Sequence, residues 1–191
     1  MILKDLVLFG AQWSGKWTQA KLLEEHFLWQ YRYFESGAIL RALSTTDNPI
    51  GNYVKGFMDK WQMIDNGLVV ALFDAFYVTL QQDQAMMVDW FPRNVPQMHS
   101  FLDRMYRNKR EMIGIWIDVP KELAIERAMK RGRPDDTRES VEKRINTYYE
   151  QTMPTIDYFL HFGKLVKIDG TKTPEEVHQE IMKELRAEIG K

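Results

Sequence analysis

The sequence contains no cysteine. This absence excludes a disulfide framework, a thiolate metal site and a cysteine nucleophile. Long apolar runs are also missing, because the longest one, around Gly67–Phe73, is far too short to cross a membrane. Neither sign of charge dominates, since 26 Lys and Arg stand against 27 Asp and Glu. We therefore expect a protein that binds neither nucleic acid nor a membrane.

Glycine is scarce as well, with 11 residues in a chain of 191, whereas the usually rare tryptophan occurs six times. The first five residues carry charge where a signal peptide would need an apolar stretch. We expect a cytoplasmic protein that forms a single domain over residues 1–191.

Alternating apolar segments and helical patterns predict the fold class. Short apolar runs predict buried strands at 6–9, 85–89, 113–119 and 165–170. Helical spacing predicts helices at roughly 18–28, 68–80, 97–109, 120–131, 137–150 and 174–188. Thr173-Pro174 is a typical start for the last of these helices. This alternation predicts an α/β fold with a parallel sheet.

Two segments interrupt the alternation. Segment 36–64 is predicted to be helical without any strand, as an insertion beside the sheet, with a turn at Asn48-Pro49. Segment 131–136 is short, charged and rich in turn-forming residues, which predicts a mobile loop.

The strongest motif follows the first predicted strand and opens the first predicted helix. It reads Gly10, Ala11, Gln12, Trp13, Ser14, Gly15, Lys16, Trp17 and Thr18. This spacing in this context predicts a loop whose N–H groups bind phosphate, with Lys16 between the β- and γ-phosphates. The hydroxyl that usually follows the lysine is displaced by one position, to Thr18. A chance match in a strand–turn–helix is the alternative.

Gly15-Lys16-Trp17-Thr18-Gln19-Ala20 resembles the adenylate kinase form of this loop, and further segments follow in the family's order. Glu35–Arg41 resembles the start of the monophosphate-binding helices, and Asp89–Gln97 resembles the Asp-Gly-Phe-Pro-Arg-x-x-x-Gln signature. Segment 131–136 with Arg144 resembles the lid and the helix after it, and 167–172 resembles the segment lining the adenine of ATP.

The resemblance implies a nucleoside monophosphate kinase of the short-lid form. The implied architecture is a three-layer P-loop kinase fold with a five-stranded parallel sheet, a helical monophosphate-binding insert at 36–64 and a short lid at 131–136. The implied reaction is reversible, Mg²⁺-dependent transfer of a phosphoryl group from ATP to AMP, which gives two ADP. No structural zinc is expected, and a monomer is expected.

The resemblance also implies residue roles. The implied catalytic residues are Lys16, Arg93, Arg131, Arg133 and Arg144. ATP would bind the loop from Gly10 to Thr18 together with Arg127, Arg131 and Lys172. AMP would contact Ser36, Arg41, Gln62, Met63, Ile64, Trp90, Arg93, Gln97, Arg133 and Arg144. Thr18 and Asp89 would hold Mg²⁺ through water.

The chemistry of phosphoryl transfer supports these assignments. Two nucleotides bring many negative charges together, so catalysis depends on positioning and on charge neutralisation. Arginine suits this task because it grips phosphate bidentately and stays charged. Surface arginines paired with carboxylates are the alternative, and an ordinary strand-end cap is the alternative for Asp89. Asp135-Asp136 matches the acids that order the lid arginines in the family, against an exposed acidic turn.

Gln97 bears on the choice of substrate. A side-chain amide can pair with both the donor and the acceptor of the adenine edge. In the family, Gln at this position goes with AMP, whereas UMP/CMP kinases differ here. A Gln that faces solvent from a helix is the alternative, and a kinase of another nucleoside monophosphate remains an alternative function.

The departures from the family are of one chemical type. Trp13, Trp17, Trp61 and Trp90 each stand where the family has glycine. Loop glycines allow positive φ and a close approach of the backbone to phosphate, so an indole at position 13 needs an unfavourable backbone conformation. For the chain as written we predict weakened ATP binding and low activity.

Two hypotheses explain these tryptophans. In the first, the source organism reads UGA as glycine, and the protein made in the cell is an active kinase with glycine at these positions. In the second, the tryptophans are real and the chain is a catalytically impaired nucleotide-binding protein. The retained Lys16, Asp89 and Arg93 favour the first, because a protein freed from catalysis should lose them too.

Overall fold

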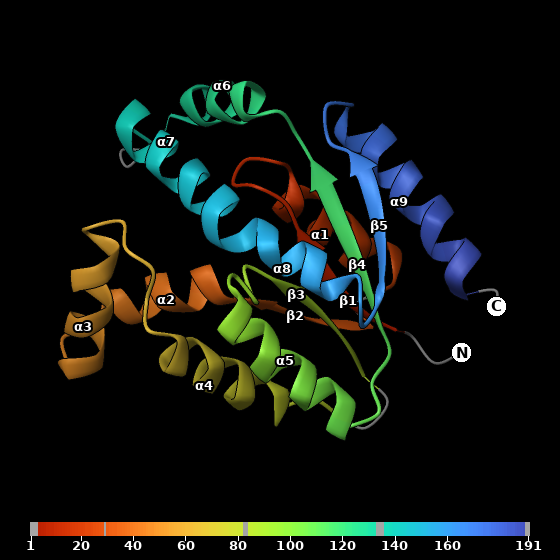
Figure 1. The fold of residues 1–191 in the computed structure, drawn as a ribbon, viewed down its shortest axis with the longest axis horizontal. Helices are drawn as coiled ribbons and strands as arrows, with labels where there is room; N and C mark the ends of the chain where they lie inside the picture. The colour runs from red at the N-terminus through yellow and green to blue at the C-terminus, as the bar shows by residue number, and fades with distance from the viewer. Residues whose placement is uncertain (1–3, 29, 82–83, 133–135, 190–191) are drawn as a thin grey trace.

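A computed structural model describes residues 4–28, 30–81, 84–132 and 136–189 (Figure 1). Its centre is a five-stranded, all-parallel sheet in the order β2-β3-β1-β4-β5. The strands are β1 (Asp5–Phe9), β2 (Tyr31–Glu35), β3 (Ala85–Asp89), β4 (Met112–Asp118) and β5 (Lys164–Asp169). Leu8 of β1 pairs with Asp89 of β3 and with Ile115 of β4, so the carboxyl ends of these strands meet at one edge.

Helices cover both faces of the sheet. In the described residues they are α1 (Lys16–His26), α2 (Ser36–Ser44), α3 (Pro49–Met58), α4 (Asn66–Tyr77), α5 (Val95–Arg107), α6 (Lys121–Arg131), α7 (Arg138–Thr147), the π-helical turn η1 (Tyr148–Thr152), α8 (Met153–Phe159) and α9 (Pro174–Ile189). Side chains alternate along β1: Leu6 and Leu8 pack with α1 and α9, whereas Val7 and Phe9 pack with α4, α5 and α8. The molecule therefore has three layers, which confirms the predicted fold class.

Aromatic packing fixes the end of β3 against the helices. The rings of Phe73 and Phe91 stack with centroids 4.7 Å apart, and Phe34 and Phe101 each lie 5.4 Å from Phe73. All four side chains are fully buried. This cluster holds together β2, α4, α5 and the segment between β3 and α5.

The four strands predicted from apolar runs are confirmed to within one residue at each end. The pattern did not predict β2, because Tyr31–Glu35 is an edge strand with mixed burial and no apolar run. The helix predicted at 137–150 ends as an α-helix at Thr147, and the chain continues through η1 into α8, which was not predicted.

Predicted helix starts are confirmed by their caps. Thr173 Oγ1 accepts a hydrogen bond from the N–H of Glu176, and Glu176 accepts one from the N–H of Thr173, which is a capping box. Asn48 caps α3 by accepting from the N–H of Gly51, with Pro49 as the first helical residue. Segment 36–58 folds into α2 and α3 without a strand, as predicted.

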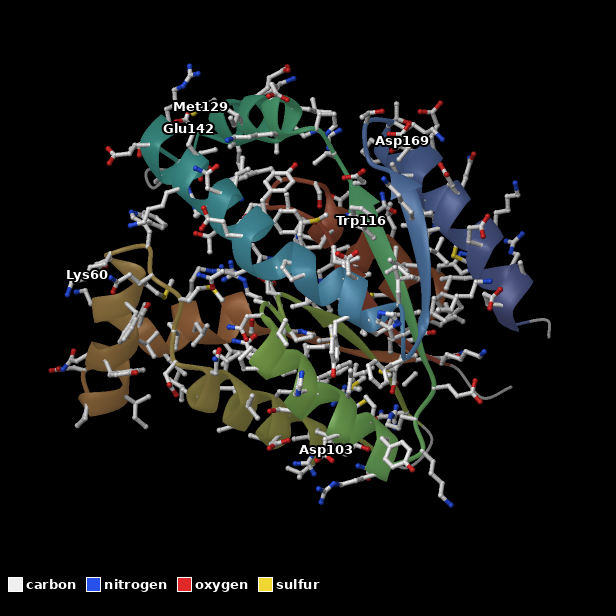
Figure 2. The ribbon with its side chains drawn as sticks, in the orientation of Figure 1. Lys60, Asp103, Trp116, Met129, Glu142 and Asp169 are labelled. Carbon is white, nitrogen blue, oxygen red and sulfur yellow. The ribbon has the colours of Figure 1, made fainter. Side chains whose placement is uncertain are left out.

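The insert and the helices after β4 lie at the same end of the molecule. Figure 1 shows α3 at the end far from both termini, with α6 and α7 across from it. Figure 2 labels Lys60 just after α3, at the end of the insert nearest to α7, which carries Glu142. Lys143 Nζ donates to the carbonyl of Lys60 at 3.1 Å, so the two parts touch. Within the described ranges, no helix is long and apolar enough to cross a membrane.

Candidate functional site

The loop between β1 and α1 has the backbone of an anion-binding turn. Gly10 and Gly15 have φ of 145° and 98°, and Gly15 is the N-cap of α1. A β-carbon at Gly10 would lie 2.6 Å from the carbonyl oxygen of Ile117, so only glycine fits there. The N–H groups of the first turn of α1 point into this loop, where an anion would be stabilised.

Lys16 lies inside the loop. It is 7% exposed, and its Nζ donates to the carbonyls of Gly10 at 2.7 Å and Ala11 at 2.9 Å. Burial lowers the pKa of Lys16, and the nearby carboxylate of Asp89 opposes that shift. The ammonium group is therefore held inside the loop. An anion bound beside it would stabilise its charged form and so oppose the effect of burial.

Several polar atoms of the loop region are buried without a hydrogen-bond partner. Among the described residues they include Gln12 Oε1, Ser14 Oγ and Gln19 Oε1. Buried polar groups in proteins are normally satisfied, so such atoms at one place indicate a bound ligand or ordered water.

Asp89 ends β3 beside the loop and is completely buried. Its carboxylate accepts hydrogen bonds from the Tyr33 hydroxyl at 3.2 Å and from the N–H of Trp90 at 2.8 Å. Burial raises the pKa of Asp89 to about 6, and the charge of Lys16 opposes this rise. Burial of the Tyr33 hydroxyl, together with the neighbouring charge of Asp89, raises the pKa of Tyr33.

The donor set suits Mg²⁺ carried by a nucleotide. No group of three or more His, Cys, Asp or Glu side chains that could hold a metal occurs in the part of the chain that the structure describes. Mg²⁺ typically keeps several waters and is held by one or two carboxylates together with substrate phosphates. Asp89, together with Thr18 at the wall of the loop cavity, fits that pattern.

Asp136 brings two of the predicted arginines together. Arg131 donates to both of its carboxylate oxygens at 2.9 Å, and Arg144 donates to Oδ1 at 3.0 Å. Asp136 is 5% exposed, so the exposed acidic turn considered above is wrong for this residue. Arg133 and Asp135 lie outside the described residues.

The loop cavity has a volume of about 600 Å³. Most predicted ATP-binding residues line it: Gln12, Trp13, Ser14, Gly15, Lys16, Trp17, Thr18, Arg127, Arg131 and Lys172. Arg127 donates to the carbonyl of Gly170 at 2.8 Å, and Lys172 pairs with Glu180 at 2.7 Å. Gly170, in the predicted segment 167–172, also lines the loop cavity, as do Glu35, Pro174 and Val177, which were not predicted to bind ATP.

The insert cavity is smaller, about 210 Å³, and borders the loop cavity. It is lined by Ser36, Arg41, Gln62, Met63, Ile64, Trp90, Arg93, Gln97, Arg131 and Arg144, which include all the described residues predicted to bind AMP. Gln12, Trp13, Arg41, Trp90 and Arg131 line both cavities, so the two meet around these side chains.

Hydrogen bonds hold polar side chains at the wall of the insert cavity. Arg41 donates to Glu35 at 2.8 Å, and Ser36 donates to the carbonyl of Trp90 at 2.7 Å. Burial lowers the pKa of Arg93 to about 10, so its guanidinium remains charged at neutral pH. Arg41 and Arg93 both line the insert cavity, and two guanidiniums bordering one space suit an anionic phosphate.

Gln97 is buried at the wall of the insert cavity, with 1% of its surface exposed. Its Oε1 accepts from the N–H of Arg93 at 2.8 Å, and its Nε2 donates to Asn66 Oδ1 at 2.9 Å. The alternative of a solvent-facing Gln is therefore wrong. Nothing in the sequence pattern pointed to Asn66, because its role depends on the packing of α4 against α5.

Three of the four tryptophans at family glycine positions have a left-handed backbone. The φ angles of Trp13, Trp61 and Trp90 are 63°, 54° and 62°. Glycine adopts this conformation readily, whereas a bulky residue is strained there. Trp17 differs, since it lies within α1 with its side chain 60% exposed.

The indoles cover the predicted catalytic cations. Arg144 is sandwiched between Trp13 and Trp61, with its guanidinium 4.7 Å and 4.6 Å from the ring centroids. Arg93 lies 4.8 Å and Lys16 5.5 Å from the ring centroid of Trp90. The indoles of Trp13, Trp61 and Trp90 therefore occupy space directly beside these cations.

Comparison with known proteins agrees with this arrangement. A family model for adenylate kinase matches residues 8–164. The adenylate kinase of Bacteroides fragilis is 31% identical over 185 residues, which cover 94% of this chain and 96% of that protein. Adenylate kinase 1 of a Synechocystis species is 34% identical over 176 residues, which cover 91% of this chain and 92% of that protein. This chain belongs to the adenylate kinase family.

Proposed function

We propose that the chain catalyses reversible phosphoryl transfer from ATP to AMP, with ATP in the loop cavity and AMP in the insert cavity. Two cavities that meet around Arg131, Trp90 and Arg41 carry this proposal. A donor phosphate in one cavity and an acceptor phosphate in the other would lie close enough to react.

In the proposed reaction, an α-phosphate oxygen of AMP attacks the γ-phosphorus of ATP. The bond between that phosphorus and the β–γ bridging oxygen breaks, and ADP forms on both sides. Lys16 and the N–H groups of the loop would bind the β- and γ-phosphates, and Arg131 and Arg144 would neutralise the transferring group. Arg133, outside the described residues, would act with them.

The remaining residues would position the two nucleotides. Arg127 and Lys172 border the part of the loop cavity proposed for the adenosine of ATP. Arg41 and Arg93 would hold the α-phosphate of AMP, and Gln97 would read its base. Ser36, Gln62, Met63 and Ile64 would complete the wall around AMP.

Bound with ATP, Mg²⁺ supplies positive charge to the β- and γ-phosphates. Asp89 and Thr18 would hold it through water. With a pKa of about 6, Asp89 is ionised at neutral pH and becomes protonated in mild acid. Charge neutralisation at the loop therefore depends on the protonation state of Asp89.

The strained tryptophans support the hypothesis that the cell places glycine at positions 13, 61 and 90, and by extension at 17. All the described cations of the site are retained, which a purely structural nucleotide-binding protein would not need. The catalytically impaired protein remains the second candidate, supported by the indoles that cover Arg144, Arg93 and Lys16.

A coupled assay for ADP separates these candidates. It would compare the chain as printed with the glycine form, defined as the chain with Trp13, Trp17, Trp61 and Trp90 all replaced by Gly. We expect ADP formation from ATP and AMP by the glycine form, low activity of the printed chain, and little product when UMP or CMP replaces AMP. An inactive glycine form would refute the proposed function.

The coding sequence tests the recoding hypothesis directly. UGA codons at positions 13, 17, 61 and 90 are expected, and UGG at all four would contradict it. We also propose a monomer, because one copy of the chain holds both cavities, and a cytoplasmic location, as expected from the sequence. Sedimentation with and without nucleotides checks the oligomeric state.

A further inference from the structure

Three side-chain amides connect the starts of two helices behind the insert cavity. Asn94 caps α5 and Asn66 is the first residue of α4, while Gln97 lies in the first turn of α5. Asn94 Nδ2 donates to Asn66 Oδ1 at 2.8 Å, and Gln97 Nε2 donates to the same oxygen at 2.9 Å. We call Asn94, Asn66 and Gln97 the amide relay.

The relay leaves each amide one orientation. Asn94 Oδ1 must face α5, because it accepts the N–H of Gln97 at 3.0 Å, and this turns its Nδ2 toward Asn66. Asn66 must then present its oxygen, so Gln97 must present its nitrogen there. At the other end, the N–H of Arg93 requires the oxygen of Gln97, at 2.8 Å. Both ends of the Gln97 amide are thus specified.

This orientation decides which base edge Gln97 can bind. One N–H of Nε2 and one lone pair of Oε1 are used within the protein, which leaves one donor and one acceptor for a ligand. Adenine offers a matching ring acceptor at N1 and an exocyclic donor at N6. Guanine in the same pose offers the reverse pair, so two donors and two acceptors would meet. A buried site that leaves polar groups unpaired rejects such a ligand.

We propose that Asn66 is a positioning residue for nucleotide specificity, because it locks the Gln97 amide in the orientation that accepts adenine and rejects guanine. The proposal rests on the assignment of the insert cavity to AMP. Asn66 itself is not among the residues that line the two cavities in the described part of the chain. It therefore acts on the base only through Gln97.

Calorimetric titration of AMP and GMP tests this role without requiring turnover. Both the printed chain and the glycine form would be titrated, each with Asn66→Leu and Asn66→Asp. Asn66→Leu removes the shared acceptor, so AMP binding is expected to weaken about fivefold to tenfold while GMP binding does not, which lowers AMP-over-GMP discrimination by the same factor. Asn66→Asp keeps an acceptor and is expected to retain discrimination.

Two further variants separate positioning from stability. Asn94→Asp keeps the oxygen that caps α5 but removes the donor to Asn66, so it should fold and still lose discrimination. Asn52→Leu, at an exposed position of α3, is the matched control and should change neither affinity. Circular dichroism would establish that each variant is folded.

The outcomes are distinct. Loss of discrimination in Asn66→Leu and Asn94→Asp, with rescue in Asn66→Asp, supports the proposal. AMP binding by the parent proteins with unchanged discrimination in Asn66→Leu overturns the role of Asn66 alone, as does equal loss in Asn66→Asp. Absence of AMP binding in both parent proteins overturns the proposed function of the cavity, and the role of Asn66 falls with it.

Discussion

The two cavities are built in different ways. One continuous segment, residues 12–19, lines the loop cavity where the chain passes from the loop after β1 into α1. The insert cavity takes its walls from α2, α4, α5, α7 and the segments between them. A local motif therefore supplies one continuous part of the first cavity, whereas the second is assembled from short contributions of several distant elements. Variants should consequently affect them differently.

The largest effect is expected at the centre of the loop cavity. Lys16→Met in the glycine form removes the buried cation while keeping much of its volume, so kcat should fall at least about a hundredfold. AMP affinity, measured by calorimetry, should change little because Lys16 does not line the insert cavity. Lys183→Met, on the exposed side of α9, is the control. A kcat of Lys16→Met near that of the control would contradict the assigned role.

Replacing Asp136 is expected to reduce kcat less than Lys16→Met does, but to affect substrate binding in both cavities. Asp136→Asn in the glycine form keeps the shape but removes the charge that holds Arg131 and Arg144. Because both guanidiniums remain but lose their positions, kcat should fall about tenfold to a hundredfold. Steady-state kinetics with each substrate varied would show both KM values rising. A rise in only one KM would mean that Asp136 serves one cavity alone.

The ionisation of Asp89 should affect catalysis and stability in opposite directions as the pH changes. With a pKa near 6, Asp89 loses its charge as the pH falls from about 7 to about 5, and kcat/KM should fall about tenfold. Stability should move in the opposite direction. Between the ordinary pKa of 3.8 and about 6 the folded state binds the extra proton, so this contribution to the free energy of unfolding decreases as the pH rises.

Steady-state kinetics and urea unfolding at several pH values measure kcat/KM and the free energy of unfolding. The variant Asp89→Asn should make both quantities less dependent on pH over this range. A kcat/KM that stays constant down to about pH 5 would refute the assigned ionisation.

The smallest effect distinguishes the tryptophan in a helix from those in the left-handed region. Trp17→Gly should destabilise the printed chain by about 1 kcal/mol, because glycine weakens a helix and the exposed indole contributes little packing. Trp90→Gly removes a left-handed strain of about 1–2 kcal/mol and loses a cation–π contact worth about 0.5–1 kcal/mol, so stability should hold or rise. Urea unfolding measures both, and equal losses would contradict the strain at position 90.

Elements with a strong local signal were predicted well. Apolar runs located β1, β3, β4 and β5, and the cap at Thr173 located the start of α9. The pattern failed at β2, whose edge position leaves some of its side chains partly exposed, and at α8, which continues α7 through a π-helical turn. In both cases the neighbouring elements, rather than the local sequence, determine the conformation.

The sequence by itself determined the family, the phosphate-binding loop and the identity of the cations, because these depend on contiguous residues and on charge. Only the tertiary structure decided which groups meet. It brought Asn66 to Gln97 across 31 positions of sequence, placed the guanidinium of Arg144 beside both Trp13 and Trp61, and set the left-handed backbone at three tryptophans. Such pairings arise where separate elements pack together, and a linear pattern carries no record of that contact.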